Sequence, residues 1–415
     1  MRRRIALMFA GIAIMMPLLA GCKVEYAENM TSAENTEETQ PDDKVIRVRY
    51  SDGKYTEYLR YCEAEYEKNN KDIDIVPELV SSDNYVNNIN NDSAAAENVP
   101  DVYMAVNSNL GTLYLAGLAY KNTSDKFTSE NYCDVAINSC SYNGTLVAYP
   151  LSYKTSFLLY NTKYLTENDV ASFAAMETYS ENADFFSSEE SAAVESVFRC
   201  EINDLFTNYA FVSPGLSIGG RNGDDASSFS IYNETTEAAS KEYLSLIDYF
   251  SISARNTYNG CMKKFLAGKF LSVIATTDSL STIADGKIAC AAAAFPDYNS
   301  KLLTRPLSIT TALVVNPYSQ NVTDASKFAE FATSELAGEL YSYTGMLSTH
   351  KNIEYDKEYL SQIYDSYAKS APKNKLVYGE QVYPLLEIAL HNIVNGDDIK
   401  EQLTSVDDYM KKQLN

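Results

Sequence analysis

The sequence predicts an α/β protein with two lobes, and two observations support this fold class. From residue 46 to residue 117, patterns typical of strands alternate with patterns typical of helices, as in a parallel sheet covered by helices. The part of the chain that follows an N-terminal leader and tether, residues 45–415, is large for one hydrophobic core and suits two.

The N-terminus begins with arginines at residues 2–4 and an apolar run over residues 5–18. This run has the length of a signal peptide and is short for a bilayer span. Leu19-Ala20-Gly21-Cys22 follows and resembles the bacterial lipobox. We expect residues 1–21 to be a lipoprotein signal peptide and Cys22 to carry lipid, such as palmitate. The alternative is a plain signal peptide, or a short membrane anchor with an incidental cysteine.

Residues 22–44 are expected to be a disordered acidic tether. They are rich in Asp, Glu, Ser, Thr and Asn and contain almost nothing apolar, so they cannot bury enough surface to become ordered. An ordered cap on the first strand is the alternative. No later stretch is apolar enough to span a membrane, so the remaining chain would be held at the extracytoplasmic face of the cell membrane.

The chain is strongly acidic, with a formal net charge of −22 at pH 7. Such a chain does not supply the cations that displace counterions from phosphates, which argues against a nucleic-acid partner. Anionic solutes and anionic headgroups would also be repelled, so a neutral or cationic ligand fits better.

Cysteine and histidine usage argues against a metal site. No C-x-x-C pair exists, and His350 and His391 are the only histidines. We therefore expect neither a metal nor a cofactor. The compartment permits disulfides, but free thiols are favoured because Cys62 and Cys290 lie on apolar stripes like ordinary core residues. The cysteines that follow Cys22 are Cys62, Cys133, Cys140, Cys200, Cys261 and Cys290.

Three strands and three helices are predicted in the first part of the chain. Residues 46–50 alternate between apolar and polar side chains, as in a strand, whereas residues 55–66 place apolar side chains at helical spacing. A β-branched strand, a polar helix, a buried strand and a short helix follow at residues 73–76, 84–98, 102–106 and 110–116.

The later elements are predicted from the same patterns. Residues 189–210 read as one long helix, because Val194, Val197, Phe198, Ile202 and Leu205 share a face. Strands are expected at residues 146–151, 157–160, 271–275, 288–295 and 309–315, a polar loop at 215–228, and a helix at 238–250. Three further helices are expected, one capped by Thr323 or Asp324, one over residues 382–393 ended by Gly396, and one started by Asp398 with Glu401.

Five short segments, taken in order, resemble the extracellular solute-binding protein family that includes maltose-binding protein. Each segment has a counterpart in the family. They are a "P-D-V" strand, a crossover with the pattern "G-x-x-x-x-x-P" followed by "YN", an "F-x-x-G-K" turn, an "S-E" helix ending in glycine, and the C-terminal helices. These segments are residues 99–103, 143–161, 265–269, 334–345 and 385–403. They cover nearly the whole chain after the tether.

The resemblance implies a two-lobed periplasmic-binding-protein fold (type II) with a ligand cleft between the lobes. Crossovers would fall near residues 150–152, 294–311 and 344–349. Lobe one would then be residues 45–151 plus 310–346, and lobe two residues 152–309 plus 347–415. The family further implies a monomeric, lipid-anchored binding protein, not an enzyme. It would close on a sugar or oligosaccharide by a hinge motion and deliver it to the membrane permease of an ABC transporter.

Candidate ligand-binding residues follow strands, because ligands bind at the carboxyl ends of strands in such sheets. Asp52 follows the first strand and could bond a ligand or merely form an Asp-Gly turn. Asn107, Ser108 and Asn109 follow the third strand and could bond hydroxyls or cap a helix. Tyr153 is a further candidate.

Lys154 lies with Tyr153 just beyond the first crossover. Maltose-binding protein has a carboxylate at the position of Lys154, so the lysine argues against a maltose-like ligand. A solvated surface amine is the alternative for this residue.

The resemblance adds Tyr209, Asp278 and Tyr383. Tyr209 and Tyr383 match positions where the family stacks aromatic rings on sugars, and Asp278 takes the place of a tryptophan in the maltose binder. The chain has 33 tyrosines and no tryptophan, so tyrosine would have to supply the stacking faces. For any single tyrosine, an ordinary place in the core or on the surface is the alternative.

Two other functions stay open. A surface glycoside hydrolase would need only two well-placed carboxylates, whose separation the fold decides. A receptor of the same fold, or a binder of polyamines or other cationic solutes, would suit the acidic composition.

Overall fold

The computed structural model describes residues 44–414. The predicted signal peptide, the lipidation site at Cys22 and the tether up to residue 43 lie outside the described residues. The described residues form one compact unit. The predicted alternation of the first part is confirmed by β1 (Lys44–Tyr50), α1 (Thr56–Asn69), β2 (Ile73–Leu79), α2 (Tyr85–Ala95), β3 (Val102–Val106) and α3 (Leu110–Leu115).

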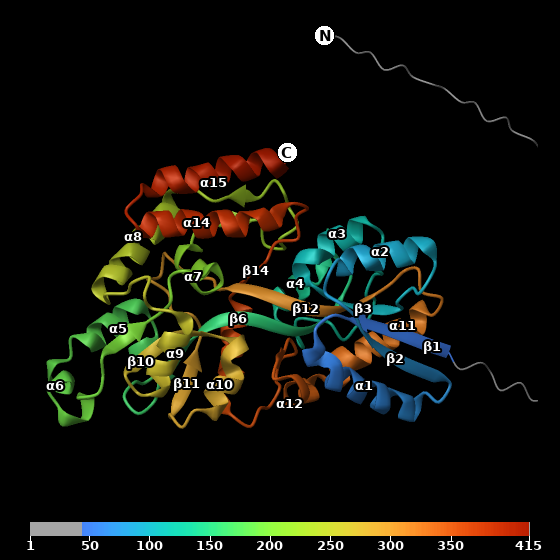
Figure 1. Cartoon of the computed structure of the whole chain (residues 1–415), viewed down its shortest axis with the longest axis horizontal. Coiled ribbons are helices and arrows are strands. Elements are labelled where there is room, and N and C mark those ends of the chain that lie inside the picture. Colours follow the sequence, from blue (N-terminus) through green and yellow to red (C-terminus); the bar gives the residue numbers. More distant parts are fainter. Residues whose placement is uncertain (1–43, 415) are drawn as a thin grey trace, which may run out of the picture. The chain divides into compact units, whose positions relative to one another are not determined.

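A single path of paired strands runs through the molecule in the order β2-β1-β3-β12-β6-β10-β7. β1 is parallel to both β2 and β3, so the carboxyl ends of these three strands lie at one edge. β12 (Leu307–Val315) is antiparallel to β3 and to β6 (Tyr149–Asn161), and β6 is antiparallel to β10 (Phe270–Thr276). In Figure 1, β6 and β12 run between the strands β1–β3 and the part of the molecule that contains β10.

The remaining elements complete two helix-covered halves. The other strands are β4 (Ser141–Tyr142), β5 (Thr145–Leu146), β7 (Ser196–Arg199), β8 (Ser217–Ile218), β9 (Phe229–Ser230), β11 (Cys290–Ala293), β13 (Leu347–Ser348) and β14 (Ala371–Pro372). The other helices are α4 (Asp134–Ser139), α5 (Phe173–Ser180), α6 (Ala183–Phe186), α7 (Leu205–Val212), α8 (Glu234–Tyr249), α9 (Tyr258–Leu266), α10 (Leu280–Asp285), α11 (Val322–Glu330), α12 (Leu340–Thr344), α13 (Glu358–Ala368), α14 (Val382–Val394) and α15 (Ile399–Leu414).

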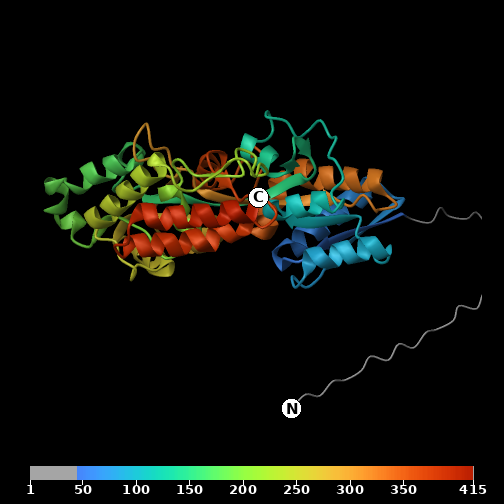
Figure 2. The same ribbon diagram turned by 90° about the horizontal axis from the view of Figure 1, so that it is seen from above.

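Apolar residues of these elements gather in three buried clusters. The first contains side chains of β1, α1, α11 and α13 and of one face of β3. The second contains side chains of α2, α3 and the opposite face of β3. The third contains β7, α7, α8 and the C-terminal helices α14 and α15. These last two helices lie side by side, as both views show (Figure 1 and Figure 2). The predicted apolar stripes of α14 and α15 therefore face a core.

Residues 149–161 form one strand, so the prediction of two strands with a break was wrong. Ser152, Thr155 and Ser156 in the supposed break are buried, and the backbone there pairs with neighbouring strands. Ser152 lies opposite Thr311 of β12, and Ser156 lies opposite Thr276 of β10. The Thr155 hydroxyl donates to the Leu307 carbonyl at 3.2 Å. Polar side chains do not end a strand when the sheet pairs its backbone, and here the hydroxyls of Ser152 and Thr155 also find hydrogen-bond partners.

The predicted long helix over residues 189–210 is also wrong. Ser196–Arg199 forms β7, which pairs in parallel with β10, and α7 begins only at Leu205. The Asp204 side chain accepts a hydrogen bond from Thr207 N at 3.0 Å and starts that helix. Val197 and Phe198 are buried because β7 pairs with β10 at one end of the sheet and lies in the core that also contains α7 and α8, and their spacing matched a helical face by coincidence.

Helix ends agree with the predicted caps in one case and differ in another. Asp398 Oδ1 accepts from Glu401 N at 2.8 Å and starts α15 as expected. The predicted cap of α11 is wrong, because the helix begins at Val322, before Thr323 and Asp324. The Asp324 carboxylate instead forms ion pairs with Lys44 and Lys327.

Cys62, Cys133, Cys140, Cys200, Cys261 and Cys290 are free thiols in the structure. All are buried except Cys290, which is partly exposed. Between residues 44 and 414, no helix is both long and apolar enough to cross a bilayer. The same part of the chain contains no group of three or more His, Cys, Asp or Glu placed to hold a metal ion.

Candidate ligand-binding site

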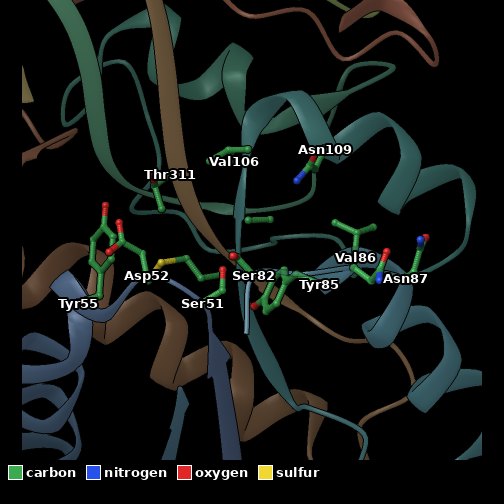
Figure 3. Close-up of a pocket in the computed structure, with 13 residues that line it drawn as sticks. Ser51, Asp52, Tyr55, Ser82, Tyr85, Val86, Asn87, Val106, Asn109 and Thr311 are labelled. Atoms are coloured by element: carbon green, nitrogen blue, oxygen red, sulfur yellow. The ribbon is translucent and has the colours of Figure 1, made fainter. Parts of the chain in front are cut away.

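A cavity of about 400 Å³ opens where β1, β2 and β3 end. Figure 3 shows it between the start of α1, the starts of α2 and α3, and β12. This is the edge at which parallel α/β sheets bind ligands. It is lined by Ser51, Asp52, Tyr55, Ser82, Asn84, Tyr85, Val86, Asn87, Met104, Ala105, Val106, Asn109 and Thr311.

The cavity offers hydroxyls, carboxamides, aromatic rings and one carboxylate. None of its 13 lining residues is Lys, Arg or His. The exposed Asp52 carboxylate accepts a hydrogen bond from Lys54 N at 3.0 Å through Oδ1, which forms the turn before α1. The turn thereby holds the Asp52 carboxylate at the carboxyl end of β1. This carboxylate is the only formal charge among the lining residues.

Tyr55 links the cavity to the long strand β6. Its ring is buried, and its hydroxyl is 2.6 Å from the Ser152 hydroxyl. Burial raises the pKa of Tyr55, and the carboxylates of Asp52 and Asp278 add to this increase. Asp278, on the turn that follows β10, therefore lies within electrostatic reach of the Tyr55 hydroxyl.

Lys154 and Asp278 form an ion pair beside the cavity. Lys154 Nζ is 2.8 Å from Asp278 Oδ2, and both side chains are partly exposed. Side chains two residues apart on a strand share a face, so Lys154 lies on the same face of β6 as Ser152, roughly 7 Å farther along. The ion pair therefore extends the polar wall that begins with Tyr55 and Ser152.

Comparison with known proteins identifies the family. Residues 63–362 match the description "Bacterial extracellular solute-binding protein". The chain belongs to this family. The family resemblance predicted from sequence is thus confirmed for this solute-binding protein. A comparison with curated proteins found no match.

Solved structures similar to this solute-binding protein share its two-lobed fold. The extracellular solute-binding protein of Staphylococcus aureus in complex with maltose has a TM-score of 0.78 at 14% identity, covering 89% of this chain and 98% of that one. The maltose-binding periplasmic protein of Listeria monocytogenes, also with maltose, has a TM-score of 0.74 at 17% identity, covering 90% and 98%. A cyclo/maltodextrin-binding protein with maltotetraose has a TM-score of 0.76 at 16% identity, covering 91% and 99%. At such identities the likeness shows the fold, and the predicted fold class is confirmed.

Four of the residues selected from sequence lie in or beside the cavity of the solute-binding protein. Asp52 and Asn109 line it, and Lys154 and Asp278 form the adjoining ion pair. Ser108, partly exposed, belongs to the 3-10 turn that precedes α3.

Tyr153 and Asn107 are directed elsewhere. Tyr153 lies on the opposite face of β6, where its ring stacks on Tyr367 with centroids 4.0 Å apart and planes at 9°. Asn107 is fully buried and uses both ends of its amide on backbone groups. Its Nδ2 donates to Lys373 O at 2.6 Å, and its Oδ1 accepts from Thr310 N at 2.9 Å.

Tyr209 and Tyr383 are buried in the core that contains α7 and α14. Tyr209 also lines a second cavity of about 190 Å³ with Arg221, Arg305 and Pro372. Burial raises the pKa of Tyr209 to about 12 and also raises the pKa of Tyr383. The Tyr383 hydroxyl accepts from Asn374 N at 2.8 Å, so this hydroxyl holds a loop in place.

Sequence reasoning missed Ser82, Tyr85, Tyr55 and Thr311 as lining residues. Ser82 follows β2, but the strand was predicted to end at residue 76, so the rule that selected Asp52 did not reach it. Tyr85 falls in the segment predicted as a polar helix. Tyr55 belonged to a helical apolar stripe and Thr311 to the interior of a predicted strand, and neither pattern marks a cavity wall.

Proposed function

We propose that this chain captures a sugar or oligosaccharide and delivers it to the membrane permease of an ABC importer. The cavity at the ends of β1, β2 and β3 carries this proposal. Sugars are bound by aromatic faces and by groups that hydrogen-bond hydroxyls, and the cavity has Tyr55, Tyr85 and Asp52 together with several amides and hydroxyls. The sugars named with the similar structures, maltose and maltotetraose, support the same class of ligand.

The proposed lobes meet on β6 and β12. Lobe one is residues 45–151 plus 310–346, and lobe two is residues 152–309 plus 347–415. β6 pairs with β12 up to Thr155 and with β10 from Ser156, and this change of partner supports a boundary in the strand. Closure of the lobes on a ligand would be a hinge motion that the permease detects.

The proposed location is the extracytoplasmic face of the cell membrane, with lipid on Cys22 as the anchor and a monomeric binding domain. The basic and apolar leader and the Leu19-Ala20-Gly21-Cys22 sequence support this part of the proposal. Family membership supports an extracytoplasmic place for the domain.

The ion pair of Lys154 and Asp278 favours a ligand different from maltose. A paired ammonium and carboxylate offers both donors and acceptors to sugar hydroxyls, but no flat apolar face. Stacking would then depend on Tyr55 and Tyr85, which line the cavity from lobe one.

A cationic solute, such as a polyamine, is the second candidate. The cavity has a carboxylate and no cationic side chain among its lining residues, and the net charge of the chain is −22. Both features would attract a cation. A glycoside hydrolase is not favoured, since the family consists of binding proteins.

A thermal-shift screen of residues 43–415 distinguishes these functions. A ligand that binds the native state raises the melting temperature by mass action, in proportion to the logarithm of its concentration above Kd. We expect a saturable rise with one class of mono- or oligosaccharide and none with spermidine or amino acids. A rise with spermidine alone would establish the cationic candidate instead. New reducing ends after incubation with an oligosaccharide would show an enzyme.

A further inference from the structure

Two loops that follow α7 and α13 reach across to the elements around α3 and α4. One loop is residues 219–225, and the other is residues 371–376, which we call the strap. The strap carries Lys375, whose side chain is buried with 1% of its surface exposed. Lys375 Nζ donates to Asn138 O at 2.5 Å and to Ser141 O. The Asn138 carbonyl lies in the last turn of α4, where a cation is favourable, and the Ser141 carbonyl belongs to β4.

The backbone of the strap fits closely against α3. A Cβ added to Gly111 would lie 1.9 Å from the Lys375 carbonyl oxygen, so only glycine allows this approach. One turn earlier, the Asn107 amide donates to Lys373 O at 2.6 Å. The strap is therefore held by its backbone as well as by the lysine.

The loop of residues 219–225 reinforces the strap. Lys375 N donates to Gly223 O at 2.6 Å, which joins the two loops. Asp224 Oδ2 accepts from Asn143 N at 2.8 Å, and Arg221 forms an ion pair with Asp134 at the start of α4. Both loops thus contact the same surface.

The two sides of this contact belong to different halves of the fold. On one side, Gly111 and Asn107 follow β3, and α4 and β4 lie next in sequence. On the other side, the strap begins with β14, which pairs with Leu307 and Ser308 of β12, and Asn374 is bonded to Tyr383 of α14. The contact therefore spans lobe one and lobe two as proposed above.

We propose that the strap and the loop of residues 219–225 form an interlobe clamp, which holds the lobes in the arrangement seen here and releases when they open. This inference rests on the proposed division into lobes. Because the Lys375 side chain is buried, the lobes can open without losing the full free energy of the bonds that break. The Lys375 ammonium has only carbonyl partners at hydrogen-bond distance, with the Asp224 carboxylate as a more distant opposite charge, and burying a charge without a direct ion pair is costly. Opening returns the ammonium to water, which offsets much of the loss.

A variant that adds one methyl group to α3 tests the clamp. Gly111→Ala places a Cβ against the Lys375 carbonyl, while alanine suits the helical backbone of α3. The matched control is Gly338→Ala in a 3-10 turn before α12, where an added Cβ meets nothing within 4 Å. Small-angle X-ray scattering on ligand-free residues 43–415 gives the radius of gyration of each variant.

We expect a larger radius of gyration for Gly111→Ala than for the wild type and Gly338→Ala, with an unchanged urea midpoint. Weaker binding of the sugar found in the screen, by about tenfold, should accompany it, because opening moves the Lys154–Asp278 ion pair of lobe two away from the cavity of lobe one and the site loses preorganisation. A wild-type radius, or a loss of folding in Gly111→Ala with a wild-type radius in Lys375→Met, would overturn the clamp. Because scattering needs no ligand, this result is independent of whether a sugar binds.

Discussion

Asp52 serves two purposes at once. Its Oδ1 accepts from Lys54 N and forms the turn before α1, and its exposed side chain lines the cavity at the strand ends. The residue type suits both purposes, since a short carboxylate caps a turn and also accepts hydrogen bonds from hydroxyls.

Asp52→Asn tests the second purpose while preserving the first. The asparagine oxygen can still accept from Lys54 N, but the charge is lost. We expect the sugar found in the screen to bind about ten- to a hundredfold more weakly, the usual value of a hydrogen bond to a charged group. Titration calorimetry measures this change. The control is Asp74→Asn, exposed on β2, which should leave affinity unchanged. Equal affinity in Asp52→Asn would remove this carboxylate from the site.

Lys375 makes stability depend on pH in the alkaline range. Burial lowers the pKa of Lys375 from 10.5 to about 8 in the folded protein. Between these two values the unfolded chain binds more protons than the folded one, so the free energy of unfolding rises with pH. Below pH 8 the lysine is charged in both states and its contribution is constant.

Lys375→Met removes this titration and serves as the reference. Relative to that variant, we expect the free energy of unfolding of the wild type to rise by about 2 kcal/mol from roughly pH 7.5 to roughly pH 9.5. Urea unfolding at the two pH values gives the difference. Other titrating groups are shared by both proteins and cancel. Parallel pH profiles would mean that the amine is solvated in the folded state.

At the scale of elements, β6 is the piece that organises both the cavity and the core. Alternation along the strand places Ser152 and Lys154 on the face that Tyr55 contacts and Tyr153 toward Tyr367 of α13. The Tyr367 hydroxyl is 2.8 Å from the Thr310 hydroxyl of β12, so α13 is tied to both crossing strands. A one-residue slip of β6 would exchange these faces, and register is therefore strongly determined.

A side-chain cap marks the start of α8. The Asn233 side chain accepts from Thr235 N and Thr236 N, each at 3.0 Å, and starts α8. We expect Asn233→Ala to lower the free energy of unfolding by about 1 kcal/mol, because two amides at the helix start lose their acceptor. Urea unfolding measures this loss. Asn90→Ala, exposed within α2, is the control and should be neutral or slightly stabilising. A neutral Asn233→Ala would show that water replaces the cap.

At the scale of the whole molecule, charge repulsion is the main electrostatic effect. The chain has a net charge of −22, and most of its ion pairs involve exposed side chains that contribute little. Salt should therefore stabilise the fold by screening repulsion more than it weakens these pairs.

We expect the melting temperature at pH 7 to rise as NaCl increases from about 0.02 M to about 0.3 M, where the Debye length falls severalfold. Calorimetry of residues 43–415 checks this. Close to the isoelectric point of about 4.5 the net charge vanishes, and the same salt step should have little effect or the opposite sign. A falling melting temperature at pH 7 would mean that specific ion pairs outweigh the net repulsion.

Local patterns were sufficient wherever structure is decided within one segment. The alternation of strands and helices in the first part, the apolar stripes of α14 and α15, and the position of Asp52 after β1 were all predicted correctly from neighbouring residues. These features follow from side-chain period and turn chemistry, which the chain carries locally. The family resemblance rested on such segments in order, and the family match confirms it.

Only the tertiary structure decided features that depend on partners distant in sequence. β7 is a strand because β10 lies beside it, and β6 is continuous because β12 and β10 pair with its two halves in turn. Tyr55 faces a cavity rather than only a core, and Asp278 reaches Lys154, because crossing strands bring these residues together. The sequence by itself determined the strand and helix alternation of the first part, the fold class and the charge. Tertiary packing decided which polar side chains meet at the cavity. Strand pairing joins residues that are far apart in the sequence, and no local pattern predicts which of them become neighbours.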